Sequence, residues 1–219
     1  MLLCIFGSLV AQETRLLGLE PKDGAVRGPR PVFRIAALDL PDEQLRALEL
    51  RLALSADRFL SEAYVFDRRE REAGWAAGEQ GQLLYHPHAP IVDGEYEWKL
   101  WVWSGVDWIV GSPTYRLRID SVPPDEVQEL RVEHDETRDA LVLEWLPVTL
   151  DIQGSAEFVA RYRVYGHDRA SPFPPAAVYE IGATSTPRLE IPLQPGEDPP
   201  LWFFKVTAID AAGNETGRR

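Results

Sequence analysis

The chain has 219 residues, of which 23 are Lys or Arg and 35 are Asp or Glu, and its formal net charge at pH 7 is −12. This length allows one or two domains, and a hydrophobic content of 45% is enough for a packed core. An acidic chain without a basic cluster argues against nucleic acid and anionic membranes as partners, because both are bound mainly through basic side chains. Cys4 is the only cysteine, which excludes an internal disulfide and a zinc site built from several cysteines.

Residues 1–11 have the length and the flank of a secretory signal peptide. The run 1–10 is apolar, and polarity rises sharply at Gln12. Ten apolar residues are too few for a membrane-spanning helix, which needs about 20. No positive charge precedes the run, as expected if the start codon is assigned too far downstream. The alternative interpretation of this segment is a first strand or a buried terminal segment. We expect an exported protein, secreted or held in the periplasm or cell envelope.

Residues 12–120 alternate apolar and polar side chains with the period of two that is typical of strands with one buried face. The alternation is strict over 47–54, although a helix over 41–56 is the competing interpretation because leucine is also a good helix former. Strict alternation favours a strand. We expect the strands of this half at 47–54, 63–66, 83–86, 95–103 and 114–119.

The most regular alternation in the chain covers residues 95–103. One face of this strand is expected to bury Tyr96, Trp98, Leu100 and Val102. The other face then presents Trp101 and Trp103, whose indoles lie about 7 Å apart along a strand and offer stacking surfaces to successive sugar rings. The alternative is that both indoles pack against the long connection 55–82 or against the neighbouring domain, because exposed apolar patches are normally covered.

Residues 121–125 break the pattern. The adjacent Pro123 and Pro124 cannot donate hydrogen bonds to a sheet and hold the chain extended, which predicts a short, stiff linker between two domains. The second half then repeats the same pattern of short strands and turns. Its expected strands are 127–132, 139–148, 159–166, 176–182, 188–193 and 201–210.

The second half, 126–219, resembles a fibronectin type III domain of the kind common in exported bacterial proteins. Trp145, the segment 151–166 and the segment 203–215 carry the resemblance. The resemblance implies a sandwich core that contains Trp145, Tyr162, Trp202 and Phe204. In this family a tyrosine near the start of the sixth strand bonds to upstream backbone, and here Trp202 takes that position. Few residues follow the sixth strand, so we expect the last strand to be short or missing.

Residues 12–120 are similar to a more distant immunoglobulin-like or type III-like sandwich. The residues that carry this similarity are 21–24, 31–33 and 93–98, with Tyr96 at the position of the bonding tyrosine. The expected fold class is therefore all-β, with two tandem immunoglobulin-like or fibronectin type III-like β-sandwiches.

No catalytic motif is present in the sequence, so we expect no catalytic, cofactor-binding or metal-binding residues. His86 and His88 have a spacing that suits two metal ligands, but a third ligand is missing and a solvated loop explains the pair. Asp120, Asp125 and Asp151 lie near the linker, where a calcium ion is a further hypothesis, although no dense run of aspartates supports it.

By analogy of fold alone, we expect a non-enzymatic exported module that binds a protein partner or acts as a spacer at the cell surface. One alternative is a carbohydrate-binding accessory module that uses Trp101 and Trp103. The other is a non-catalytic fragment of a larger secreted hydrolase. The residues do not identify the partner or the oligomeric state.

Overall fold

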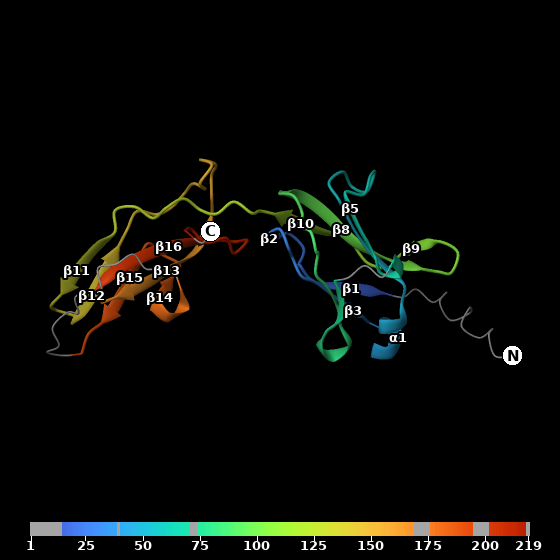
Figure 1. The fold of residues 1–219 in the computed structure, drawn as a ribbon, viewed down its shortest axis with the longest axis horizontal. Coiled ribbons are helices and arrows are strands. Elements are labelled where there is room, and N and C mark those ends of the chain that lie inside the picture. The colour runs from blue at the N-terminus through green and yellow to red at the C-terminus, as the bar shows by residue number, and fades with distance from the viewer. Residues whose placement is uncertain (1–14, 39, 71–73, 169–175, 195–201, 218–219) are drawn as a thin grey trace. The chain divides into compact units, whose positions relative to one another are not determined.

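A computed structural model describes residues 15–38, 40–70, 74–168, 176–194 and 202–217 (Figure 1). The chain divides into two compact units, the first up to Asp120 and the second from Ser121. Both units consist mainly of antiparallel strand pairs with short connections, which confirms the all-β fold class. The expected signal peptide, 1–11, lies outside the described residues.

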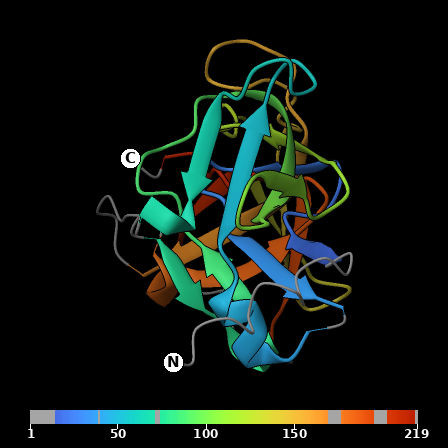
Figure 2. The same ribbon diagram turned by 90° about the vertical axis from the view of Figure 1, so that its right-hand side faces the viewer.

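Two sheets form the first unit (Figures 1 and 2). The four-stranded sheet has the order β1-β3-β7-β6, with β1 Leu16–Glu20, β3 Phe33–Ala37, β7 Leu83–Tyr85 and β6 Trp75–Ala77. The other sheet has the order β2-β10-β8-β4-β5, with β2 Ala25–Arg27, β10 Tyr115–Ile119, β8 Gly94–Trp103, β4 Leu50–Ser55 and β5 Tyr64–Asp67. The short strand β9 (Trp108–Val110) pairs with the end of β8, and β2 runs parallel to β10.

Trp98 lies at the centre of the first core, with no exposed surface. Its ring meets Phe33 edge-on, with the ring centroids 5.2 Å apart, and stacks on Tyr115 at 4.6 Å. Burial alternates along β8, so that Tyr96 is buried with Trp98 while Trp101 and Trp103 on the opposite face are half-buried. Hydrophobic burial of such aromatic side chains is the main source of stability in a sandwich of this size.

The strand expected over 47–54 is wrong at its N-terminal end. Residues Asp42–Ala47 form a short helix, α1, and β4 begins only at Leu50. Leu45 points into the core and is 1% exposed, so the helix gains a buried anchor that the alternation of leucines did not reveal. The competing helix over 41–56 is right for its first turns and wrong for the rest. Short 3-10 turns lie at η1 (Arg68–Glu70) and η2 (Glu79–Gly81).

Two three-stranded sheets form the second unit. The first has the order β11-β12-β15, with β11 Arg131–Asp135, β12 Ala140–Glu144 and β15 Arg188–Pro192. The second has the order β14-β13-β16, with β14 Glu180–Thr184, β13 Val159–His167 and β16 Phe203–Asp210, and a 3-10 turn η3 (Ala177–Tyr179) precedes β14. Trp145 lies between the sheets, 5% exposed, and meets Tyr162 edge-on at 5.3 Å.

Trp202 is not a core residue, contrary to its expected place. It is 37% exposed, whereas Phe204 is half-buried and packs against the core. The pairing of β13 with β16 ends at Phe203, so Trp202 lies beyond the last paired residue and its ring rests over Gly166 at the end of the sandwich. Other strand limits also differ: β11 begins at Arg131 instead of 127, β12 ends at Glu144 instead of 148, and η3 replaces the start of the strand expected at 176–182.

The proline segment is held against the second unit. Pro124 pairs with Asp151 in an isolated bridge, and the N–H of Asp125 donates to the carbonyl of Leu150 at 2.9 Å. Thr216 Oγ1 lies 3.2 Å from the carbonyl oxygen of Pro124. The sequence predicts a short, stiff linker at 121–125, and the structure assigns this segment to the second compact unit.

Candidate functional site

The outer face of β8 carries a stack of aromatic and cationic side chains at its C-terminal end. Trp103 and Trp108 meet edge-on, with their ring centroids 5.4 Å apart. The guanidinium of Arg69 lies 4.2 Å from the centroid of Trp103 and 4.7 Å from that of Trp108, and Arg51 lies 5.8 Å from Trp108. Cation–π contacts of this kind hold the β4–β8 sheet and the connection after β5 together.

A second cation covers the neighbouring indole. Lys99 Nζ lies 4.5 Å from the centroid of Trp101 and 3.9 Å from that of Phe59. Phe59 and Arg69 both belong to the connection 55–82, so this connection supplies groups that lie over the outer face. Both tryptophans thus have a charged group within cation–π distance. This arrangement agrees with the alternative in which Trp101 and Trp103 pack against the connection 55–82. Sequence reasoning did not find Phe59, Arg69 or Trp108, because only the fold brings them beside β8.

The loop after β4 is fixed by a hydrogen-bonded carboxylate. Asp57 accepts from the hydroxyls of Ser55 and Ser61, each at 2.6 Å, and from the N–H of Ser61 at 2.9 Å. These hydrogen bonds, that from Ser55 foremost, lower the pKa of Asp57 from 3.8 to about 2. Arg58 and Phe59 both adopt the left-handed region, with φ of 59° and 63°, a conformation that side chains disfavour.

The same loop turns one apolar side chain outward. Leu60 is 90% exposed, while the adjacent Phe59 is anchored on Lys99. The hydrogen bonds of Asp57 offset the strain of two consecutive left-handed residues. The loop displays Leu60 at the surface, with the exposed Arg58 nearby in the chain.

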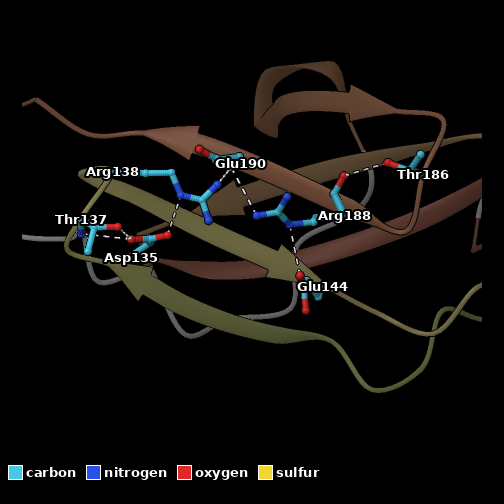
Figure 3. Close-up of polar contacts among 7 residues, drawn as sticks. All are labelled: Asp135, Thr137, Arg138, Glu144, Thr186, Arg188 and Glu190. Atoms are coloured by element: carbon cyan, nitrogen blue, oxygen red, sulfur yellow. Dashed lines mark hydrogen bonds and ion pairs between the residues drawn. The ribbon is translucent and has the colours of Figure 1, made fainter.

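A network of charged side chains covers the outer face of β11, β12 and β15 (Figure 3). Glu190 accepts from Arg138 at 3.0 Å and from Arg188 at 3.3 Å, and Arg188 also pairs with Glu144 at 3.1 Å. Arg138 reaches Asp135 at 2.7 Å. Hydrogen bonds from Thr137 and then Arg138 lower the pKa of Asp135 from 3.8 to about 2. Asp135, Arg138, Glu144 and Arg188 are among the residues that line a depression of about 480 Å³.

A buried carboxylate holds the turn after β16. Glu215 accepts from the hydroxyls of Tyr165 at 2.5 Å and Thr207 at 2.7 Å, and its other oxygen accepts from Arg163 at 3.0 Å. Its side chain is 3% exposed. These three hydrogen bonds link β13 and β16 to the turn that contains Glu215. Burial raises the pKa of the Tyr165 hydroxyl above its usual value.

Two of the carboxylates in these networks, Asp57 and Asp135, suit hydrogen bonding better than proton donation. At neutral pH Asp57 and Asp135 are ionised and hydrogen-bonded, so neither is a proton donor. Asp151 accepts from the N–H groups of Gln153 at 2.8 Å and Ser155 at 2.9 Å. Among the described residues, no three His, Cys, Asp or Glu side chains lie close enough to share a metal ion.

His86 and His88 lie in the exposed segment that follows β7, and the structure gives this pair no third metal ligand among the residues that it describes. The described helices are all too short or too polar to cross a membrane.

Comparison with models of known protein families gives no match, and neither does comparison with curated proteins. Among solved structures, the FN1–FN3 domains of chicken CNTN1 match over 89% of this chain and 63% of theirs, with a TM-score of 0.51 and 11% identity. The chain thus spans less than two thirds of that structure. At this identity the likeness shows the fold, which is that of fibronectin type III domains. The endo-β-1,4-mannanase of Thermotoga petrophila matches half of this chain and 20% of its own, with 15% identity and a TM-score of 0.34.

Proposed function

We propose that this chain is a non-catalytic module of an exported protein and that it binds a protein partner. The observation that carries the proposal is the loop after β4, where Asp57 fixes two left-handed residues and Leu60 is left 90% exposed. A rigid loop loses little conformational entropy on binding, and an exposed leucine gains from entering an apolar pocket. The fold, shared with the type III domains of CNTN1, suits a scaffold that presents loops.

The partner expected from this loop has an apolar pocket for Leu60 and an acidic group near Arg58. A photo-crosslinking amino acid at position 60 tests this directly when the protein is added to the surface and secreted fractions of its source. We expect one crosslinked protein, lost on competition with unlabelled chain and reduced by Asp57→Ala. The same probe at Val178, which is 82% exposed in the second unit, is the matched control.

Equal crosslinking at both positions, or none at position 60, would contradict the proposed role of the loop. Export is tested separately, by N-terminal sequencing of the mature protein. A mature chain that begins near Gln12 supports a signal peptide at 1–11, whereas a mature chain that begins at Met1 contradicts it.

Carbohydrate binding through Trp101 and Trp103 stays a second hypothesis. Both indoles are half-buried, which leaves part of each ring accessible, but Lys99 and Arg69 lie over them. Double substitution of both tryptophans by alanine in a glycan pull-down tests the hypothesis. Unchanged binding to every retained polysaccharide would contradict it.

A further inference from the structure

The outer face of β11, β12 and β15 carries its charges in two rows across the strands. Strand pairing places Arg131, Glu144 and Arg188 side by side, which we call the arginine row. Two residues along, it places Glu133, Val142 and Glu190 side by side, which we call the glutamate row. Leu141 and Leu143, which alternate with these positions on β12, are buried, so both rows face solvent.

The two rows have opposite charge. The arginine row holds two positive charges and one negative, and the glutamate row holds two negative charges around one apolar side chain. Several of these side chains are well exposed, with side-chain exposure of 73% at Arg131, 60% at Glu144 and 42% at Arg188. Successive rows on one face of a sheet lie about 7 Å apart, so side chains of both rows can reach a flat partner at once.

This pattern is complementary to itself. A twofold axis that runs across the strands between the rows turns the face over, so that the arginine row of one copy lies on the glutamate row of the other. Arg131 then meets Glu133 of a second copy, and Arg188 meets Glu190. Each contact occurs twice, because the symmetry repeats it. Half-buried Val142 lies near the centre, opposite the aliphatic part of Glu144.

The charge of the whole chain makes arginines important at any contact between two copies. The net charge of −12 makes two copies repel each other, and the repulsion is smallest where basic groups gather. Three arginines gather on this face, Arg131, Arg138 and Arg188, beside the carboxylates of Glu133, Asp135, Glu144 and Glu190. At the margin Arg131 also pairs with Glu129 at 3.4 Å. The ion pairs that link Arg138, Glu190 and Arg188 hold the side chains in place before any contact with a partner (Figure 3).

We infer that this face is the contact between two copies of the chain. A patch of three strands and five residues per strand measures roughly 14 by 16 Å, which is small against the area of about 800 Å² per partner in a stable complex. The dimer is therefore weak, with a dissociation constant on the order of 0.1–1 mM. Because exposed charges hold it together, it weakens as salt screens them.

Sedimentation equilibrium of the full chain, at low and high salt, tests the inference first. At about 20 mM salt we expect a monomer–dimer equilibrium whose dissociation constant rises at least about tenfold by about 500 mM salt. An NMR dilution series on the same samples is expected to shift resonances of β11, β12 and β15. A chain that stays monomeric at about 1 mM protein and low salt, or shifts confined to other strands, overturns the inference.

Charge reversal provides the decisive experiment. Arg131→Glu with Arg188→Glu makes both rows acidic, and Glu133→Arg with Glu190→Arg makes both rows basic, so each double variant alone is expected to be monomeric. An equimolar mixture of the two is expected to form a heterodimer, because each acidic row then meets a basic row. Circular dichroism checks that both variants keep the fold. Failure of the mixture to associate overturns the inference.

The matched control changes the net charge equally at another surface. Arg34→Glu with Arg46→Glu lies in the first unit, where both side chains are exposed. We expect its self-association to fall far less than that of Arg131→Glu with Arg188→Glu. Equal loss in both variants would mean that net charge alone controls association, and that the two rows are not the contact.

Discussion

The hydroxyl of Tyr96 donates a hydrogen bond to the carbonyl oxygen of Val92, with 2.9 Å between the oxygens. The N–H of the same Val92 donates to the hydroxyl of Tyr64, also at 2.9 Å. The two tyrosine rings meet edge-on, with centroids 5.9 Å apart. Both polar groups of one backbone residue are thus bound by tyrosines, which ties the turn before β8 to β5, two strands away in the same sheet.

Tyr96→Phe is expected to lower the free energy of unfolding by about 1–2 kcal/mol, because it leaves the carbonyl of Val92 without its donor. Burial, followed by the neighbouring Tyr64, raises the pKa of Tyr96 above 10.0. The native state therefore favours the neutral phenol, and its contribution is complete below pH 10 and lost as pH rises through the raised pKa. Urea unfolding at neutral and alkaline pH measures this contribution. If the free energy of unfolding falls equally in the variant and the parent between the two pH values, the prediction is contradicted.

Asp57 is expected to titrate with a midpoint near pH 2, which NMR chemical shifts of its side chain measure. Because its pKa is lowered in the folded chain, its stabilising effect is present above about pH 4 and is lost as pH falls through 2. Asp57→Asn is expected to speed amide exchange at Phe59 and Ser61, whose N–H groups bond within this loop. A midpoint near the usual 3.8 would show that the hydrogen bonds are absent in solution.

Gly18→Ala is expected to destabilise the first unit by about 1–3 kcal/mol, because overpacking strains a filled core. A Cβ at this position would lie 2.1 Å from Cη2 of Trp98, which is fully buried and cannot move aside. Combining Gly18→Ala with Trp98→Phe makes room for the methyl group. Denaturant unfolding measures the stability of both single variants and of the double variant. The double variant is expected to lose less stability than the sum of the two single losses, and an additive loss would contradict the proposed clash.

Glu215→Gln is expected to lower the free energy of unfolding by about 2–3 kcal/mol. The carboxylate accepts hydrogen bonds from Tyr165, Thr207 and Arg163 with its two oxygens, whereas the amide of Gln has one accepting oxygen and an NH₂ group that only donates. Thr207→Val removes a single donor and is expected to have a smaller effect. Thermal and denaturant unfolding measure both variants. Equal effects would indicate that the charge of Glu215 contributes little.

Much of the fold is readable from local pattern. Strict alternation placed Tyr96 and Trp98 on one face of β8 and Trp101 and Trp103 on the other, because one buried sheet face imposes a period of two. The same rule misassigned Ala47, since a helix of six residues with one buried leucine leaves little periodic signal. Trp202 was misplaced because its burial depends on where strand pairing ends, which no local pattern records.

The surface features were less predictable. Trp101 and Trp103 were identified from alternation, whereas their neighbours Arg69 and Phe59 come from a connection with no regular period. The arginine and glutamate rows depend on the register of the hairpin β11–β12 and of β15, which follows much later in the sequence. A shift of one residue in either pairing would move these side chains to the other face, so only the assembled sheet reveals them.

The bridge between Pro124 and Asp151 moves the start of the second cooperative folding unit. A fragment cut at Glu126, where the sequence alone suggests the domain begins, would remove the bridge partner of Asp151 and leave the hydroxyl of Thr216 without the carbonyl of Pro124. Expression of the isolated second unit therefore requires residues from Ser121 onward. The prolines that mark the boundary in the sequence are bonded to the domain that follows them, through the bridge of Pro124 and the hydrogen bond from Ile152 to Pro123.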